Sequence, residues 1–336
     1  MQTRLLSLLS LGLAAACAAE PRPAATPAVQ VSPPLDLAGS AYEAAASVRL
    51  PAVPPGEFPG LHNVYFLSER IFSGSEPEGE EAFAELAAWG VKTILSVDGK
   101  VPDAAAAARH GLRTVHVPIQ YRGFAPEELQ KIAKTFRELD GPFYVHCYHG
   151  QHRGPAAAAV GRIVLDGASR EEAIAEMRQW CATAAKYEGL YAAIASAPLP
   201  SAAETRACAF DFAPAHAFAG LRPLMVELGR KWDLLAAARA RTWAVDPAHP
   251  DVDPLQEATQ AHQLLAAAVA LEEAAARPAD FRAWLAEACE GAGALVRALS
   301  SGVGEKSGGE EQRAAAESAF AAVTATCTSC HEEYRD

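Results

Sequence analysis

Two short segments of the chain place cysteine beside residues that could act with it in a chemical site. One lies near the C-terminal end and reads Cys327-Thr328-Ser329-Cys330-His331. In a helix, positions i, i+3 and i+4 lie on one face, so both thiols and the imidazole share a side. Two thiols can bond one porphyrin edge while His331 coordinates the iron as an axial ligand. We therefore predict haem c on Cys327 and Cys330; half a zinc site or a disulfide pair is the alternative.

The other segment, residues 146–155, reads His-Cys-Tyr-His-Gly-Gln-His-Arg-Gly-Pro. Such a loop between a strand and a helix can aim backbone N–H groups and the helix N-terminus at one anion. Arg153 adds a planar two-pronged donor for a phosphoryl group, and the positive surroundings favour a thiolate nucleophile at Cys147. His146 is expected to hold the loop by hydrogen bonds. The predicted phosphate-binding residues are Tyr148, His149, Gly150, Gln151, His152 and Arg153.

Strands alternate with helices in the part of the chain that must position this loop. The pattern predicts strands at 64–67, 70–73, 92–97, 113–118 and 142–146. Helices are expected at 77–89, 102–110 and 126–139, with two or three more between 155 and 196. This alternation predicts an α/β domain over 58–196, in which helices flank a central sheet.

The Cys327–His331 motif belongs to a part of the chain where only helices are expected. Residues 197–205 are rich in proline at their start and predict a linker. Beyond it, helices are expected at 218–240, 254–276, 281–299 and 310–333. Asp253 is a good N-cap, with Pro254 at the first helical position and Gln256 closing a capping box. Four long helices predict an antiparallel, all-α four-helix bundle over 206–336.

The loop and the order of elements before it resemble the cysteine-dependent protein tyrosine phosphatase superfamily, its compact dual-specificity branch most. The resemblance covers residues 60–196. It implies hydrolysis of phosphomonoesters through a phosphocysteine on Cys147, with Arg153 and the loop amides binding the transition state. Two features depart from the family pattern. The Ser or Thr that follows the loop Arg is replaced by Gly154, and the Asp that protonates the leaving oxygen is missing, since no Asp or Glu occurs from Ala104 to Pro126.

Loss of a general acid typically costs about 10²–10⁴ in rate, mostly on substrates with poor leaving groups. The candidate substitutes are Glu127, Glu128, Asp98, Asp103, His149 and His152. One alternative is therefore a weak or inactive oxyanion-binding domain on a cytochrome c electron carrier. Another is a thiol-based enzyme, such as an arsenate reductase or a sulfurtransferase-like protein, with Cys181 as resolving thiol.

The C-terminal region, residues 206–336, resembles class II cytochromes c of the cytochrome c-prime type. These proteins carry Cys-x-x-Cys-His on the last of four helices, followed by an aromatic and a basic residue, here Tyr334 and Arg335. The resemblance implies electron transfer if Met225, on the first helix, is the sixth iron ligand. With an open site it implies binding of a small gas such as NO or CO. His216 is a weaker candidate ligand, and pairing through the first helices would give a homodimer.

The N-terminal residues predict export. Arg4 precedes an apolar run, residues 5–13, and small residues follow, so residues 1–18 are expected to be a signal peptide. Alternatively, Cys17 is the lipid-modified residue of a lipoprotein, which would anchor the protein to a bacterial envelope membrane. Residues 19–57, rich in Pro and Ala, are expected to be an extended tether. We thus predict a periplasmic protein.

The composition of the chain limits the classes of partner that it could bind. The chain of 336 residues has a formal net charge of −12 and no basic block, which argues against nucleic acid. Expected partners are a phosphorylated small molecule, polymer or protein, and a redox partner or gas for the haem. Outside the two motifs and Cys17, the remaining thiols of Cys181, Cys208 and Cys289 allow at most one disulfide.

Overall fold

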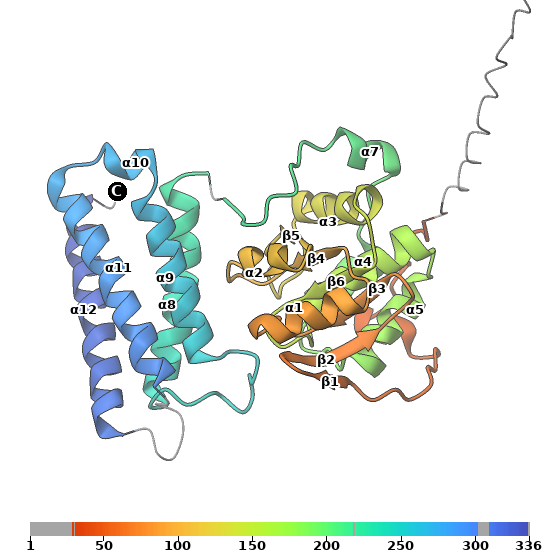
Figure 1. Ribbon diagram of the computed structural model, residues 1–336, viewed down its shortest axis with the longest axis horizontal. Helices are drawn as coiled ribbons and strands as arrows, with labels where there is room; N and C mark the ends of the chain where they lie inside the picture. Colours follow the sequence, from red (N-terminus) through yellow and green to blue (C-terminus); the bar gives the residue numbers. More distant parts are fainter. Residues whose placement is uncertain (1–28, 30, 218, 302–308, 335–336) are drawn as a thin grey trace, which may run out of the picture.

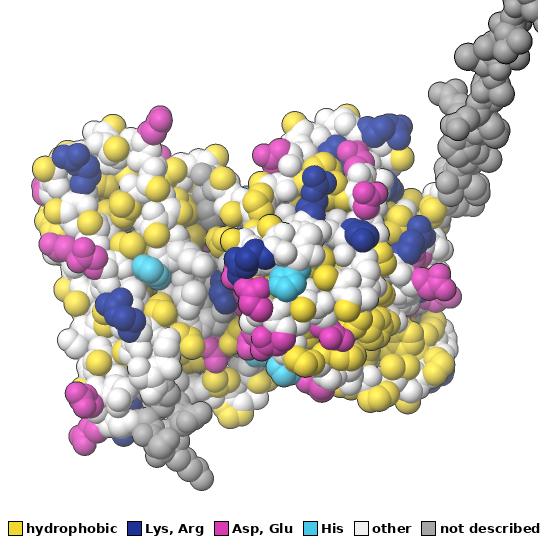
Figure 2. All heavy atoms as spheres, viewed as in Figure 1, with side chains coloured by type: hydrophobic (Ala, Val, Ile, Leu, Met, Phe, Trp, Pro, Cys, Tyr) yellow, Lys and Arg dark blue, Asp and Glu magenta, His cyan; other side chains and the backbone are white. Residues whose placement is uncertain are grey.

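The computed structural model describes residues 29, 31–217, 219–301 and 309–334, which form an α/β region and a helical region (Figure 1). In the space-filling view the two regions lie side by side, in contact below a notch (Figure 2). The predicted signal peptide with Cys17, the start of the predicted tether and Arg335 lie outside the described residues.

Six strands form one sheet in the order β1-β2-β3-β6-β4-β5. The strand pairs β1–β2 and β2–β3 are antiparallel, whereas β3, β6, β4 and β5 run parallel. All the predicted strands are present, and β1 is an additional one. The strand bounds are β1 Gly56–Phe58, β2 Leu61–Phe66, β3 Ile71–Gly74, β4 Thr93–Ser96, β5 Arg113–His116 and β6 Phe143–His146.

Helices cover both faces of this sheet, because neighbouring residues of its central strands bury their side chains on opposite faces. Ile94 and Tyr144 pack against α1 and α2, whereas Leu95 and Val145 pack against α3 to α6. The prediction of an α/β region with flanking helices is therefore confirmed. The helices are α1 Gly79–Ala88, α2 Ala104–Arg109, α3 Pro126–Glu138, α4 Arg153–Gly161, α5 Arg170–Ala175 and α6 Glu188–Ser196, with π-helical turns η2 Arg162–Asp166 and η3 Glu176–Trp180.

The described part of the predicted tether is not a free extended chain. A 3-10 turn, η1 Ala41–Ala45, buries Ala41 and Ala45 in the core beside α5 and α6. The Leu35 amide donates to the Ala195 carbonyl at 2.8 Å. The prediction was wrong here because apolar side chains between the prolines, Leu35 among them, gain by covering the α/β core.

The predicted linker, residues 197–205, also packs against the α/β region. Helix α7 Ala202–Ala207 begins with a capping box between Ser201 and Glu204 and lies on α3. Thr205 is fully buried, and its carbonyl accepts from the Lys134 ammonium at 3.0 Å. The crossing between the two regions therefore lies later in the chain than predicted, after α7.

The helical region contains α8 Leu221–Ala240, α9 Pro254–Val269, α10 Glu272–Ala275, α11 Ala279–Ser300 and α12 Glu310–Tyr334, packed side by side (Figure 1). Asp253 caps α9 as predicted, accepting from the Gln256 amide at 2.9 Å. The helix expected at 254–276 is two helices, because α9 ends at Val269. Trp232 stacks on Phe320 at 4.7 Å between centroids, which joins α8 to α12. Among the described helices, none is long and apolar enough to cross a membrane.

Candidate active site

The Cys-x5-Arg loop connects β6 to α4, as predicted, and its backbone is held from outside. The carbonyl of Tyr148 accepts from the Glu76 amide at 3.0 Å. The carbonyl of His149 accepts from the Asn63 side-chain amide at 2.9 Å, and that of Gln151 from the Thr183 hydroxyl at 2.6 Å. With these carbonyls turned outward, the loop amides other than that of Tyr148, which donates to Asp98, remain for the concave side, where an anion could bind.

Two glycines make this loop tight. Gly150 has a φ of 74°, and a Cβ atom there would lie 2.3 Å from the Gly74 carbonyl carbon. Only glycine fits without a shift of the backbone. At Gly154, a Cβ atom would lie 3.1 Å from the Cys147 nitrogen. A side chain at this position would therefore need the backbone of Cys147 to shift by a few tenths of an ångström.

Asp98, which follows β4, holds the arginine of the loop. One of its carboxylate oxygens accepts from Arg153 at 2.7 Å and from the Tyr148 amide at 3.0 Å. The other accepts from the Lys100 amide at 2.8 Å. Burial opposes the charged form of Asp98, but Arg153 and the Lys100 amide outweigh it and lower its pKa to about 2. Asp98 is therefore a charged anchor for Arg153 at neutral pH and does not fill the predicted role of substitute acid.

An aromatic ring covers the opposite side of Arg153. The guanidinium carbon lies 4.5 Å from the centroid of Tyr121, which is a favourable cation–π distance. Tyr121 also stacks on Tyr187 at 4.7 Å, and His152 packs edge-on against Tyr187 at 4.6 Å. Arg153 is thus fixed between a carboxylate and a ring, which preorganises it for an anion.

Cys147 and His146 are both buried at the end of β6, with 2% and 1% of their surfaces exposed. Neither ring nitrogen of His146 makes a well-formed hydrogen bond, so the predicted network that would hold the loop is not present. The ring instead faces the backbone of Cys147 and stacks on Tyr144. Burial lowers the pKa of His146 to about 4, so the imidazole is neutral at neutral pH.

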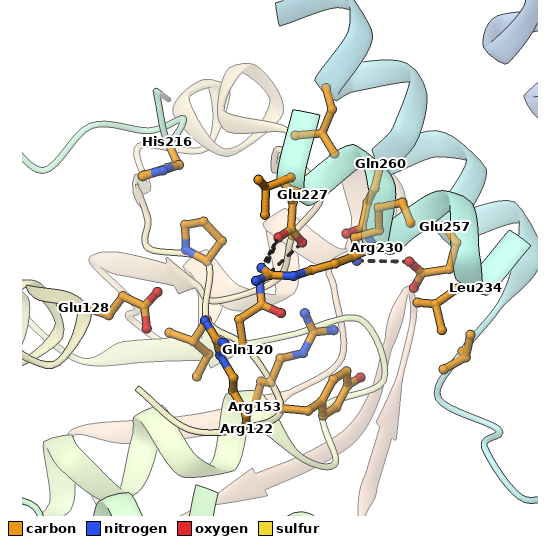
Figure 3. Close-up of a pocket in the computed structure, with 18 of the residues that line it drawn as sticks. Gln120, Arg122, Glu128, Arg153, His216, Glu227, Arg230, Leu234, Glu257 and Gln260 are labelled. Atoms are coloured by element: carbon orange, nitrogen blue, oxygen red, sulfur yellow. Dashed lines mark hydrogen bonds and ion pairs between the residues drawn. The ribbon is translucent and has the colours of Figure 1, made fainter. Parts of the chain in front are cut away.

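A cleft of about 610 Å³ lies over this site, and both regions of the protein line it. The α/β region contributes Arg153, Tyr187 and the segment from Val117 to Arg122. The helical region contributes α8, α9 and the loop between them. Figure 3 shows Glu227, Arg230, Glu257 and Gln260 on the wall that faces Arg153. No motif in the sequence indicated this cleft.

Polar contacts fix the helical region over the loop. The Gln256 side-chain amide of α9 donates to Asp98 at 3.0 Å, so a residue of the second region contacts the anchor of Arg153. The Tyr187 hydroxyl donates to Asp251, in the loop before α9. Gly99 lies against α9, and a Cβ atom there would lie 2.1 Å from the side-chain oxygen of Gln260. Gln120 donates to Glu227 at 3.2 Å.

Charged side chains of both signs line the cleft. Lys231 and Glu257 face each other at 3.0 Å, and Arg230 donates to Glu227 at 2.8 Å. Basic side chains outnumber acidic ones, so the cleft favours an anionic ligand. The basic residues that line it are Lys131, Arg122, Arg153, Arg222, Arg230 and Lys231, and the acidic ones are Glu128, Glu227, Asp251 and Glu257.

The remaining predicted substitutes for the acid are engaged or unsuited. Asp103 caps α2 by accepting from the Ala106 amide at 2.9 Å. Glu128 accepts from the Ala125 amide at 2.7 Å at the start of α3, and Glu127 is exposed. Burial lowers the pKa of His149, and lowers that of His152 to about 4, so neither is a charged donor at neutral pH.

The Cys327–His331 motif lines a separate apolar cavity of about 280 Å³ in the helical region. Cys327, Cys330 and His331 of α12 all border it, which agrees with the prediction that they share a helix face. Met225 of α8 borders the same cavity. Two unpaired thiols, one imidazole and a thioether around an apolar space suit a covalently bound haem. The apolar lining includes Leu228, Trp232, Leu265, Trp284, Leu285, Ala288 and Val323.

His216, the weaker candidate iron ligand, lies elsewhere. It borders the cleft, and its amide donates to the His116 ring at 3.0 Å, so it is not at the apolar cavity of Cys327 and Cys330. That prediction was wrong because the segment before α8 follows the edge of the sheet. Cys181 is buried in the α/β core, and Cys181, Cys208 and Cys289 are all free thiols in the structure.

Sequence comparison supports the interpretation of the α/β region. The dual specificity protein phosphatase TpbA of Pseudomonas aeruginosa is 29% identical over 136 residues, which are 40% of this chain. The chain spans 61% of the length of that relative. Part of the chain is therefore similar in sequence to a dual specificity phosphatase. No family model matches the chain.

Solved structures of similar proteins were also found. A crystal structure of P. aeruginosa TpbA in complex with phosphotyrosine has 24% identity and a TM-score of 0.39, covering 48% of this chain and 99% of that one. The core catalytic domain of the PP-IP phosphatase SIW14 from S. cerevisiae has 19% identity and a TM-score of 0.31, covering 46% of this chain and 85% of that one.

Proposed function

We propose that the protein hydrolyses phosphomonoesters through a phosphocysteine on Cys147. The observation that carries this proposal is Arg153, held by Asp98 and Tyr121 at the end of a loop whose carbonyls are turned outward. The loop amides and Arg153 would bind the phosphoryl oxygens while the Cys147 sulfur attacks phosphorus and the ester oxygen leaves. Water would then release phosphate from the sulfur.

The substrate class follows from the cleft. Its excess of basic side chains favours a small phosphorylated molecule or a phosphorylated residue of a polymer or protein. The similarity to a dual specificity phosphatase supports the reaction type. The space between the two regions limits the size of the group that can accompany the phosphate.

Turnover of an activated aryl phosphate by the purified protein, beside Cys147→Ser, tests the proposal. Because an aryl leaving group needs little protonation, this ester isolates the nucleophile from the question of the acid. We expect turnover that the substitution abolishes. Equal rates for the two proteins would exclude Cys147 as the nucleophile. No turnover by either would favour the oxyanion-binding alternative, which phosphate affinity would then test.

The thiol-based alternative has little support in the structure. Cys181 would have to attack a disulfide or an adduct on Cys147, and a thiolate does this. Burial raises the pKa of Cys181, so the thiol form is favoured. Arsenate reduction in the presence of a thiol reductant, lost in Cys181→Ser, would reverse this preference.

For the helical region we propose a four-helix haem c domain of the cytochrome c-prime type. Cys327 and Cys330 would hold the porphyrin, and His331 would be the axial ligand, with the apolar walls of α8, α9 and α11 around it. The bound group would supply electron transfer or gas binding. Met225 would be the sixth ligand. Comparison of the visible spectrum of the reduced protein with that of Met225→Leu tests this, because loss of a thioether ligand would change the spin state of the iron and shift the bands.

We also propose that the two regions are coupled through α8. Met225, Leu228 and Trp232 of this helix border the apolar cavity, whereas Glu227, Arg230 and Lys231 border the cleft. A change of α8 at one cavity therefore reaches the other without an intermediary. Phosphatase kcat/KM measured with oxidised, reduced and NO-bound haem tests the coupling, and identical values would exclude it.

Export to the periplasm completes the proposal. It rests on the predicted signal peptide and on the proposed covalent attachment of haem. Fractionation of cells that express the full chain should place the protein with periplasmic markers, or with the membrane fraction if Cys17 is lipidated. Recovery with cytoplasmic markers would contradict it.

A further inference from the structure

The α/β region brings no suitable proton donor to its own loop. The segment that faces Arg153 presents Gln120 and Tyr121, and it contains no Asp or Glu. Asp98 touches Arg153, but its pKa of about 2 keeps it ionised. A phosphate ester with a poor leaving group nevertheless needs a proton for the departing oxygen.

Four carboxyl groups line the cleft, and three of them have other tasks. Burial raises the pKa of Glu128, but its carboxylate caps α3 by accepting from the Ala125 amide at 2.7 Å. Figure 3 shows Glu128 at the end of the cleft opposite Glu257. Glu227 is engaged in hydrogen bonds, because it accepts from Arg230 at 2.8 Å and from Gln120 at 3.2 Å.

Asp251 is also arranged to stay ionised. It is 5% exposed, and burial acts against its charge. The Tyr187 hydroxyl and the neighbouring His152 outweigh burial and lower the pKa of Asp251. A carboxyl group that is stabilised as the anion holds no proton to donate at neutral pH.

Glu257 differs from these three in its position beside the anchor of Arg153. It lies in the first turn of α9, next to Gln256, which is fixed on Asp98, and only 7% of it is exposed. Arg153 and Asp98 are among its charged neighbours. Burial raises the pKa of Glu257, although Lys231 and Arg153 oppose the rise. Arrival of an anionic phosphate beside Arg153 would favour its protonated form further.

We propose that Glu257, supplied by the helical region, is the catalytic acid and base of the phosphatase reaction. The inference rests on the proposed function. As the Cys147 sulfur bonds to phosphorus and the P–O bond breaks, the Glu257 proton passes to the leaving oxygen. Lys231, 3.0 Å away, then stabilises the carboxylate. In the second step water bonds to phosphorus, the S–P bond breaks and the water proton returns to Glu257. The sum is ester plus water giving alcohol plus phosphate.

Two esters separate this role from a structural one. The full-length protein and Glu257→Gln are assayed on an activated aryl phosphate and on an alkyl phosphate. We expect Glu257→Gln to lose roughly 100-fold or more in kcat on the alkyl ester and only a few-fold on the aryl ester. Retained aryl turnover also reports that the variant is folded. The alkaline limb of the alkyl pH–rate profile should disappear in this variant.

Matched variants of the other carboxyl groups are Glu128→Gln, Glu227→Gln and Asp251→Asn, each expected to change both esters by the same factor. A loss confined to the alkyl ester in one of these would overturn the assignment. So would an equal loss of both esters in Glu257→Gln, or no loss. Aryl turnover without alkyl turnover by the unaltered protein would refute the acid but leave the phosphatase proposal intact. No turnover of either ester would refute both.

Discussion

The two cavities of this protein share helix α8 as a wall but have opposite surroundings. On one side, ten charged side chains line the cleft of about 610 Å³, and Arg153 of the Cys147 loop is one of them. On the other, the cavity of about 280 Å³ is mostly apolar and bordered by two thiols and His331. A charged cleft suits phosphoryl transfer, which is mainly a matter of electrostatic stabilisation. An apolar cavity suits a group whose iron must be shielded from water. One helix, about 10 Å thick, keeps the two chemistries apart.

Removal of the thiols that border the apolar cavity should have the largest effect. The double variant Cys327→Ser, Cys330→Ser is expected to lose all covalently bound haem, measured by haem staining after denaturing electrophoresis. Cys289→Ser changes a thiol on α11 that does not border the cavity, and it should retain the stain. Cys147→Ser should retain it too. Haem retained by the double variant would remove the distinction between the cavities.

Substitution of Asp98, the anchor of Arg153, should have the next largest effect. The effect should be confined to reactions in the cleft. Asp98→Asn replaces a charged partner of Arg153 by a neutral one, at a cost of about 1.5–3 kcal/mol. We expect kcat/KM on the aryl ester to fall roughly 10–100-fold, with unchanged haem absorption. Asp103→Asn, at the exposed N-cap of α2, should stay within about two-fold. An equal fall in both variants would mean that Asp98 has no special role.

Acidic pH should lower the folding stability of the α/β region before that of the helical region. Burial lowers the pKa of His116, His146 and His152 to about 4, against an ordinary value of 6.5. Because the unfolded chain binds these protons first, stability is full above about pH 6.5 and falls toward pH 4. Each histidine contributes up to about 1.4 kcal/mol per pH unit in this window. Thermal unfolding from pH 7 to pH 4 measures the fall, and haem absorption, which follows the helical region, should change less.

The smallest expected effect is a shift in the pH dependence of alkyl phosphate turnover. Lys231 lowers the pKa of Glu257, so Lys231→Met should move the alkaline limb of alkyl phosphate turnover to higher pH. Arg230→Met removes a partner of Glu227 and should leave that limb in place. An unmoved limb in Lys231→Met would break the link between this pair and the reaction.

The two cavities also differ in how far the sequence could predict them. The apolar cavity follows from one helix, because the spacing of Cys327, Cys330 and His331 sets their common face. The Cys147 loop was similarly local, and the strands and helices around it were predicted from periodicity. The cleft was not, because it joins residues far apart in the chain. Asp98 and Gln256, for example, are 158 positions apart. No local pattern indicates that α9 covers the loop.

The errors have related physical causes. Prolines suggested a tether before residue 57 and a linker at 197–205, yet apolar side chains between them gain more by packing on the core. His146 was expected to bond the loop, but a fully buried position leaves its ring without well-formed partners. In each case tertiary packing outweighed the local signal.

Joining the halves of the cleft through polar contacts has a consequence for motion. Gln256 with Asp98, Gln263 with Val101 and Lys186 with Ala248 are single hydrogen bonds of 2.7–3.0 Å across the boundary. Polar interfaces of this kind between regions of one chain permit rigid-body displacement. We therefore expect the helical region to move relative to the α/β region on the microsecond to millisecond scale of domain movements. Release of product would then be set by the swing of the whole helical region, with the Cys147 loop remaining rigid.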